Sequence, residues 1–166
     1  MTEHNTLAGL NAPLAKAIEF IWNEAALLDN KDYAAWSQLW SEDGVYVIPI
    51  DPDTRDFASS LNYVYDDARM RALRIERLSA GHSPSAVDAA RTLRTVSRFN
   101  LVECSGDVVE VTSAQLLFAY KRGVHTPMAA ELTHRIRFSN GAAKLEQKVV
   151  RLINSTDSLS ALGFLL

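Results

Sequence analysis

The sequence predicts an α+β fold in which N-terminal helices pack across one face of a curved, mainly antiparallel sheet. Through Leu78 the apolar side chains recur mainly at helical spacing, whereas from Thr92 onward they recur at every second residue, as in β-strands. Two turn sequences, Ser105-Gly106-Asp107 and Asn140-Gly141, separate long strand-like runs as hairpin turns do. With 166 residues, the chain is expected to form a single domain over residues 1–166.

Two helices are expected near the N-terminus. Pro13 suits the first turn of the first helix, and Asp29 and Asn30 should end it. Its apolar stripe consists of Leu14, Ile18, Ile21, Trp22, Ala25 and Leu28. Asn30 is also expected to cap a second helix, which ends at residues 41–44. The apolar side of that second helix consists of Tyr33, Trp36, Leu39 and Trp40.

Two short strands and a third helix are expected in the middle of the chain. The strands cover residues 45–50 and 61–65. Asp66 and Asp67 follow, where negative charge favours a helix N-terminus, and the helix should continue to about Leu78. Its buried side is predicted to consist of Ala68, Ala72 and Ile75. Residues 79–86, with Gly81 and Pro84, are expected to form an exposed loop.

Four strand-like runs make up the second half of the chain. They cover residues 94–103, 108–121, 128–138 and 142–155. In the third run one face carries Leu132, His134, Ile136 and Phe138, and the other carries Glu131, Thr133, Arg135 and Arg137. This alternation is typical of an antiparallel sheet with one covered face.

Composition excludes several classes of function. A net charge of −3 does not favour a nucleic acid or an anionic membrane as partner, and no apolar segment is long enough to span a membrane. We find no signal peptide, phosphate-binding loop, dinucleotide fingerprint or nucleophile elbow. Cys104 is the single cysteine, so an intrachain disulfide is impossible and a cytoplasmic location is expected. A Rieske cluster needs two cysteines and two histidines, so this chain cannot hold one alone.

The C-terminal segment VVRLINSTDSLSALGFLL has no charged side chain after Asp157. Burying a leucine or phenylalanine side chain stabilises a fold by roughly 1.5–3 kcal/mol. The tail is therefore expected either to close the core of its own chain or to dock on another subunit.

Four segments of the chain, in this order, carry a family resemblance: EAALLDNKDYAAWSQLWSEDGVYVIP, YVYDDARMRALRIERL, ARTLRTVSRFNLVE and VVRLINSTDSLSALGFLL. Together they resemble the small (beta) subunits of aromatic-ring-hydroxylating dioxygenases. Two departures stand out. The family usually has Pro-Pro-Ser where this chain has DAARTLR, and it usually has asparagine where this chain has Arg98.

The resemblance implies a cystatin-like cone, the fold of nuclear transport factor 2 and ketosteroid isomerase. It also implies a large (alpha) subunit as partner, which would carry the Rieske [2Fe–2S] cluster and a mononuclear iron. The small subunit would be a structural part of an NADH-dependent enzyme that dihydroxylates an aromatic compound, and it would form a homotrimer within a hetero-hexamer. No catalytic residue, cofactor site or metal site is then expected in this chain.

Five residues are candidates for the subunit interface. Arg91 and Arg94 match arginines of the family, and arginine suits interfaces because it pairs with carboxylates through two hydrogen bonds. Leu162, Phe164 and Leu165 come from the apolar tail. The alternative for the arginines is a solvated surface pair or an intrachain bridge to Asp66 or Asp67.

A stand-alone isomerase, dehydratase or cyclase is the alternative function. His134 would act as a general acid–base group or an iron ligand, although a hydrogen-bonded core histidine is the simpler interpretation. Asp32 and Tyr33 resemble an Asp and a Tyr that enzymes of this fold use in the cone, although a helix-terminal charge and a packed ring are simpler. An apolar cavity would instead favour a small-molecule binding module.

The remaining candidates have simpler interpretations. His82 and His125 are expected at the surface near turns, and Cys104 is expected to be inert. Several aromatic side chains could line a pocket but are more often core residues at such spacing: Trp22, Trp36, Trp40, Tyr46, Phe118 and Tyr120.

Overall fold

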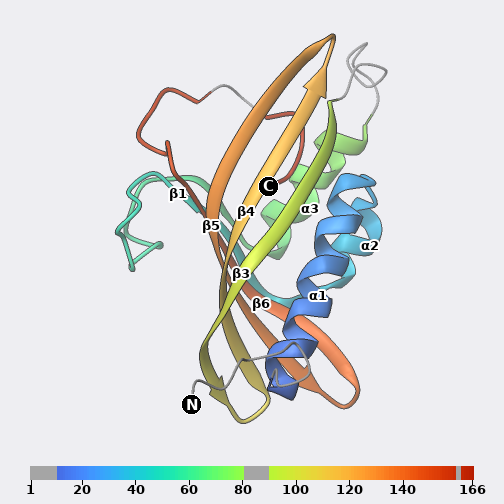
Figure 1. The fold of residues 1–166 in the computed structure, drawn as a ribbon, viewed down its shortest axis with the longest axis vertical. Coiled ribbons are helices and arrows are strands. Elements are labelled where there is room, and N and C mark those ends of the chain that lie inside the picture. The colour runs from blue at the N-terminus through green and yellow to red at the C-terminus, as the bar shows by residue number, and fades with distance from the viewer. Residues whose placement is uncertain (1–10, 81–89, 160–161) are drawn as a thin grey trace, which may run out of the picture.

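Six strands and three helices make up the described part of the computed structural model, which comprises residues 11–80, 90–159 and 162–166. The helices are α1 (Ala12–Asp29), α2 (Tyr33–Gln38) and α3 (Ala68–Ser79). The strands are β1 (Trp40–Pro49), β2 (Asn62–Asp66), β3 (Arg91–Ser105), β4 (Val108–Lys121), β5 (Val124–Ser139) and β6 (Ala142–Leu152). They form one sheet in the order β2-β1-β6-β5-β4-β3, antiparallel except between β1 and β6. The helices lie on one side of this curved sheet (Figure 1), so the predicted α+β class is confirmed.

The helix boundaries follow the capping residues, with one correction. Asn30 does not cap α2 but lies at the C-terminal end of α1. Asp32 caps α2 instead, because its Oδ1 accepts a hydrogen bond from the Ala35 N–H at 3.0 Å. Asp67 caps α3 through the Met70 N–H at 2.8 Å. None of these three helices, within the described residues, has the length and apolar character needed to cross a membrane.

Helix α3 packs through arginine rather than alanine, so the predicted buried side was partly wrong. Ala68 and Ala72 are exposed, and Ile75 is half-buried. Arg71 is 5% exposed, and its guanidinium carbon lies 4.2 Å from the ring centroid of Trp40. It donates hydrogen bonds to the main-chain oxygens of Gly44 and Asp66. A buried arginine is tolerated there because main-chain acceptors replace the lost water.

Three strands, β1, β3 and β5, begin earlier than predicted, and the hairpins are tight. β1 begins at Trp40, which was assigned to a helix, and β3 begins at Arg91. The bounds of β4 are those predicted. Positive φ angles of 51° and 75° at Asn140 and Gly141 confirm the predicted turn. A third turn, which was not predicted, joins β4 to β5, with φ angles of 50° at Arg122 and 80° at Gly123.

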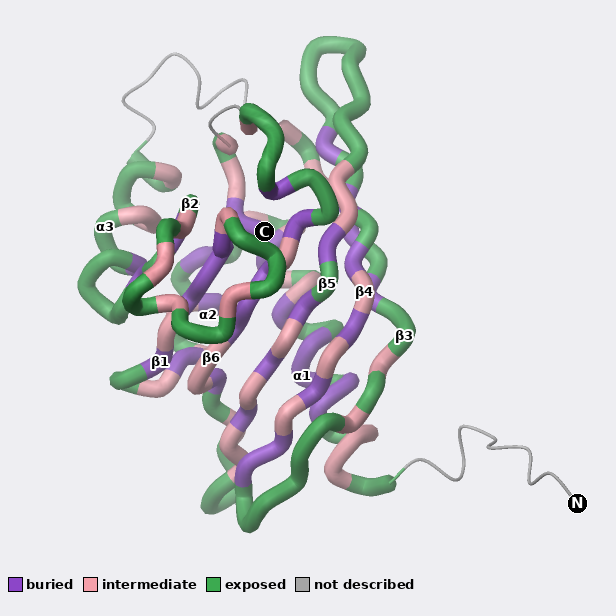
Figure 2. The backbone as a smooth tube through the Cα atoms, turned by 90° about the vertical axis from the view of Figure 1, so that its left-hand side faces the viewer, coloured by how far each residue is buried: buried purple, intermediate pink, exposed green. Residues whose placement is uncertain are grey.

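The core lies between the helices and the inner face of the sheet. Along β4 and β5 buried residues alternate with more exposed ones (Figure 2), as the predicted alternation requires. Trp36, Trp40 and Tyr46 pack together there, with ring centroids 5.3–6.2 Å apart. Trp22 was predicted in this core but is 54% exposed, and its Nε1 donates to the main-chain oxygen of Val96 on the edge strand β3 at 3.3 Å.

Candidate functional site

Glu24 of α1 lies in the interior, where donors from three other elements meet its carboxylate. Trp36 Nε1 of α2 and Lys148 Nζ of β6 donate to Oε1 at 3.0 and 2.9 Å. His134 Nε2 of β5 lies 2.8 Å from Oε2. The side chains of Glu24, His134 and Lys148 are 2%, 0% and 1% exposed. They form a buried polar cluster, which we call the interior ion cluster.

The charges in this cluster compensate one another. Burial alone would raise the pKa of Glu24, but Lys148, and then His134 and Trp36, lower it far below its ordinary value. Burial lowers the pKa of Lys148 and of His134, and Glu24 opposes that effect in both. Glu24 and Lys148 therefore form an ion pair, while His134 is neutral at pH 7 and donates from Nε2 to the carboxylate. Its Nδ1 has no hydrogen-bond partner among the described residues.

The C-terminal tail enters the cone of its own chain. Leu165 and Leu166 are 3% and 1% exposed. Lys148 Nζ donates to the main-chain oxygen of Leu166 at 2.9 Å. The Tyr46 hydroxyl accepts from the Leu166 N–H and donates to the Leu166 oxygen, both at 3.1 Å. Lys148 thus joins the interior ion cluster to the tail, which closes the core of its own chain.

Arg94 holds the same tail from the other side. Its Nη2 donates to the main-chain oxygen of Leu165 at 3.1 Å, and its Nε donates to Asp29 Oδ1 at 2.8 Å. The main-chain N–H of Arg94 donates to Asp29 Oδ2 at 2.9 Å. The expected intrachain bridge thus exists, but with Asp29 of α1. Asp66 pairs instead with Arg74 of α3.

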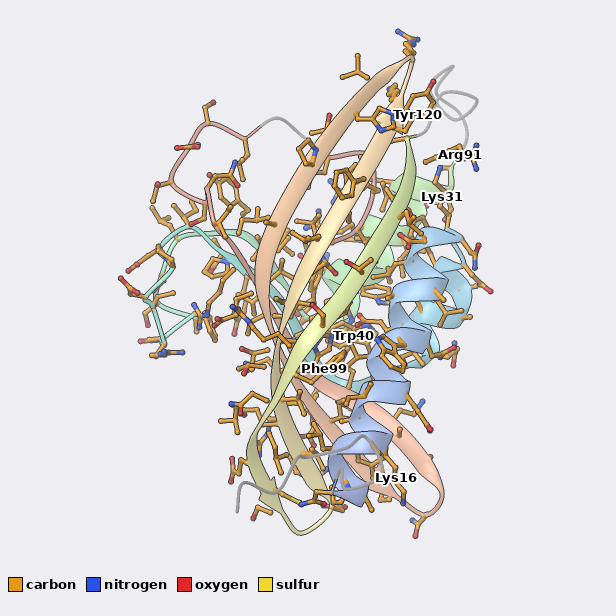
Figure 3. All side chains as sticks on the ribbon, in the orientation of Figure 1. Lys16, Lys31, Trp40, Arg91, Phe99 and Tyr120 are labelled. Carbon is orange, nitrogen blue, oxygen red and sulfur yellow. The ribbon has the colours of Figure 1, made fainter. Side chains whose placement is uncertain are left out.

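The five interface candidates differ in what they present to solvent. The Arg94 side chain and Leu165 are buried inside the chain. Leu162 and Phe164 are half-buried, whereas Arg91 is exposed on β3 opposite Tyr120 of β4 (labelled in Figure 3). An interface role for these residues stays a prediction.

The candidates for stand-alone catalysis do not lie together. Asp32 is exposed and occupied as the cap of α2, and Tyr33 is a buried residue whose pKa burial raises. His134 hydrogen-bonds to Glu24 rather than to either of them. His134 is thus the hydrogen-bonded core histidine of the simpler interpretation.

The interior ion cluster does not suit a metal ion. A facial triad needs three ligands with open positions, but here the Glu24 carboxylate already accepts from three donors, one of them the Lys148 ammonium, which would repel a cation. Across residues 11–80, 90–159 and 162–166, no three His, Cys, Asp or Glu residues are grouped so that they could hold a metal. Cys104 is exposed, the ring of His125 lies 4.8 Å from that of Tyr120, and His82 lies outside the described residues.

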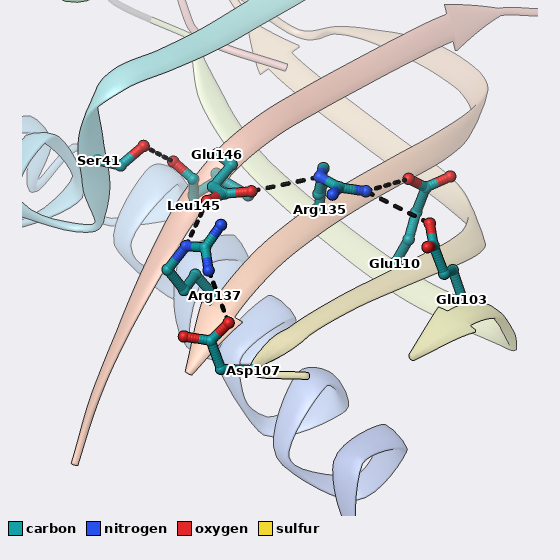
Figure 4. A network of polar contacts seen from close by, with 8 residues as sticks. All are labelled: Ser41, Glu103, Asp107, Glu110, Arg135, Arg137, Leu145 and Glu146. Carbon is teal, nitrogen blue, oxygen red and sulfur yellow. Dashed lines mark hydrogen bonds and ion pairs between the residues drawn. The ribbon is translucent and has the colours of Figure 1, made fainter. Parts of the chain in front are cut away.

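The outer face of the sheet, opposite the helices, carries charged side chains at one end. Arg135 of β5 lies 3.2–3.5 Å from three carboxylates, and Arg137 lies 2.6 Å from two (Figure 4). The acidic partners are Glu103, Asp107, Glu110 and Glu146. These neighbouring pairs form a partly exposed network of two arginines and four carboxylates, so the carboxylates are in excess by two charges.

The other end of the same face is apolar. Leu93 of β3 and Leu116 and Phe118 of β4 are 69%, 53% and 51% exposed. Leu93 lies opposite Phe118, and Phe118 lies opposite Pro127 of β5, so these side chains share one face across three strands. Tyr120 is exposed on the same face. We call Leu93, Leu116, Phe118 and Tyr120 the outer apolar patch. Of the aromatic pocket candidates, Phe118 and Tyr120 thus lie on the surface.

Comparison with known proteins points to one family. The family model of the ring hydroxylating beta subunit matches residues 23–158. The small oxygenase component of the p-cumate 2,3-dioxygenase system of Pseudomonas putida is 26% identical over 132 residues, which cover 78% of this chain and 73% of that protein. The crystal structure of the beta subunit of benzoate 1,2-dioxygenase from Burkholderia mallei aligns with a TM-score of 0.75 at 22% identity, over 99% of this chain and 100% of that one. A nuclear transport factor 2-like protein with a cystatin-like fold, from Novosphingobium aromaticivorans, aligns with a TM-score of 0.56 at 17% identity, over 90% of this chain and 92% of that one.

Proposed function

The chain belongs to the ring-hydroxylating beta subunit family, and from this premise we propose that it is the non-catalytic subunit of an NADH-dependent aromatic-ring dioxygenase. It binds a large subunit, and three copies of each chain assemble into a hetero-hexamer in the cytoplasm. Its contribution to the reaction is geometric, because it fixes how large subunits lie relative to one another.

The outer apolar patch is the observation that carries this proposal. Leucine and phenylalanine side chains more than half exposed on one continuous face are costly in water, and burying each would stabilise an assembly by roughly 1.5–3 kcal/mol. Arg91 lies beside Tyr120 at the margin of the patch. Aromatic residues and arginine are enriched in protein interfaces, so this composition supports a contact with a partner subunit.

The interior supports the same proposal. A general acid–base group works best with a pKa near the operating pH and within reach of its substrate. Glu24 and His134 are 2% and 0% exposed, and their pKa values are both lowered. These two groups therefore suit a role in stabilising the fold and do not suit general acid–base catalysis.

The redox groups would belong to the large subunit. With Cys104 as its single cysteine, this chain cannot provide the ligands of a Rieske cluster, and the interior ion cluster does not suit a mononuclear iron. Electron transfer and oxygen activation would therefore take place on the large subunit.

Co-expression with the gene of a candidate large subunit tests the proposal. The two chains should elute together at the size of a hetero-hexamer, and omission of this chain should abolish or strongly reduce oxygenase activity. Replacing Leu116 and Phe118 together by serine should prevent co-elution. The matched control is Leu61→Ser, which removes a leucine that is 81% exposed but lies outside the patch. Separate elution of the wild-type chains, with unchanged activity when this chain is omitted, would reject the proposal.

A further inference from the structure

A cavity of about 520 Å³ lies between the sheet, α3 and the C-terminal tail. Ligand pockets usually have volumes of about 300–1,000 Å³, so this space could hold a small organic molecule. Much of its wall is apolar and comes from β1, β2, β5, β6 and the tail: Ile48, Val64, Met128, Leu152, Leu162 and Phe164.

Two arginines of α3 also line the cavity, and within the described part of the chain only one of them is paired with a carboxylate. Arg74 is neutralised by Asp66, to which it donates two hydrogen bonds at 2.5 and 3.0 Å. Arg77, one turn nearer the end of the helix, is exposed to solvent and has no carboxylate partner among the described residues. A cation near a helix C-terminus is favoured by the helix dipole, and Arg77 lies in the last turn of α3. Its place on the wall of an apolar cavity, however, gives that cavity one uncompensated positive charge.

The two tyrosine hydroxyls of the wall are occupied, and the remaining polar side chains, Thr126 and Asn154, are uncharged. The Tyr46 hydroxyl bonds to Leu166, and the Tyr63 hydroxyl donates to the main-chain oxygens of Ser155 and Asp157 at 2.7 and 3.0 Å. Arg77 is therefore the group best able to select the charge of a ligand.

We propose that this cavity binds a small apolar monocarboxylate, whose carboxylate pairs with Arg77 and whose apolar body packs against Met128 and Leu152. The planar guanidinium presents two parallel N–H donors that match a carboxylate. The apolar wall excludes water from the body of the ligand. This site is separate from the outer apolar patch, so its existence does not depend on the proposed assembly function.

Methionine methyl NMR on the full chain tests the site directly. The sequence has three methionines, of which Met128 lines the cavity and Met70 is exposed on α3. Titration with 4-phenylbutyrate should shift the Met128 methyl signal in a saturable way and leave that of Met70 unchanged. The uncharged analogue 4-phenylbutyramide should bind about tenfold more weakly, because it lacks the charge-assisted pair.

Two variants separate this site from general electrostatics. Arg77→Gln should weaken 4-phenylbutyrate binding about tenfold and leave binding of the amide unchanged. Arg69→Gln, the matched control, removes an exposed charge from the same helix outside the cavity and should change neither. The proposal is overturned by the absence of a saturable Met128 shift up to about 10 mM ligand. It is equally overturned by acid and amide of equal affinity, or by an Arg69→Gln variant as impaired as Arg77→Gln.

Discussion

The replacement Glu24→Gln tests whether the interior ion cluster stabilises the fold. Glutamine has nearly the same shape as glutamate, so packing against Trp36 should change little. It would, however, leave the Lys148 ammonium, which is 1% exposed, without a counter-charge. Its amide NH₂ would also face one of the donors that Glu24 now accepts from.

The expected loss is large. Removing one partner of a buried ion pair typically lowers the free energy of unfolding by about 3–5 kcal/mol, because the remaining charge is uncompensated. For a chain of this size, such a loss lowers Tm by roughly 10 °C. The effect should also depend on pH. The pKa of Glu24 is lowered from 4.5 in the folded state, so its stabilising contribution is present above about pH 4.5 and is lost as the pH falls below it.

Urea unfolding at pH 7, followed by circular dichroism, measures the change. The matched control is Glu19→Gln, which removes an exposed carboxylate from the same helix and should change the free energy of unfolding by less than about 0.5 kcal/mol. The double variant Glu24→Gln with Lys148→Met removes both charges, and it should be more stable than the sum of the two single changes predicts.

Two results would refute this reasoning. One is a Glu24→Gln variant as stable as the Glu19→Gln control. The other is strict additivity in the double variant, which would mean that Glu24 and Lys148 do not interact in the folded protein.

Three further predictions concern single positions. Arg98 has a φ angle of 56°, which asparagine adopts more readily, so Arg98→Asn should raise the free energy of unfolding by about 1 kcal/mol, and a lower urea midpoint would contradict this. Burial lowers the pKa of His134 below 6.5, so as the pH falls the unfolded chain binds a proton at this residue before the folded chain does. The free energy of unfolding should therefore decrease below about pH 6.5. Urea midpoints measured between pH 7.5 and 5 should show this decrease, and His134→Gln should remove the contribution of this residue to it. A Cβ at Gly44 would lie 2.8 Å from Leu145 O and from Trp40 Cε3, so Gly44→Ala should lower Tm by several degrees, whereas Gly163→Ala, with open space around it, should not.

The strand register explains why sequence alone did not predict the role of Lys148. The turn at Asn140-Gly141 pairs Ile136 with Leu145, and the same regular register would place Gln147 opposite His134. A β-bulge between Arg135 and Ile136 shifts the pairing by one residue, so Lys148 lies opposite His134. Because a shift of one residue reverses the faces of a strand, this bulge turns Lys148 toward the interior.

The burial of Glu24, by contrast, could have been predicted from the sequence. Glu24 lies three residues after Ile21 and four before Leu28, on the apolar stripe that the helix buries. A charged residue at such a position requires a buried partner. The identity of that partner could not be predicted, because it lies 124 residues away and reaches Glu24 only through the bulged register.

For Trp22 and α3 the predictions of which side chains are buried were wrong. They rested on helical spacing alone, whereas tertiary contacts determine the burial of these side chains. Helical spacing placed Trp22 in the core, yet it lies at the sheet edge, where its indole N–H satisfies an oxygen of β3. The spacing along α3 predicted that alanines would pack against the sheet, yet Arg71 provides the contact, because main-chain oxygens of β1 and β2 are available to it. Apolar periodicity therefore identified the elements but did not identify the polar contacts that join them.

The interior ion cluster bears on assembly through those contacts. Glu24 of α1 bonds to residues of α2, β5 and β6, and Lys148 carries the connection on to Leu166 of the tail. Only one register of β6 against β5 satisfies all these bonds. The same register decides which side chains of β6 face outward, including Glu146, which pairs with Arg135 and Arg137 on the outer face. A buried cluster of this kind specifies one arrangement of the sheet more than it adds stability. The proposed contribution of this subunit is a surface of defined shape, which requires one arrangement of the sheet. The interior ion cluster, which no substrate can reach, would contribute by specifying that arrangement.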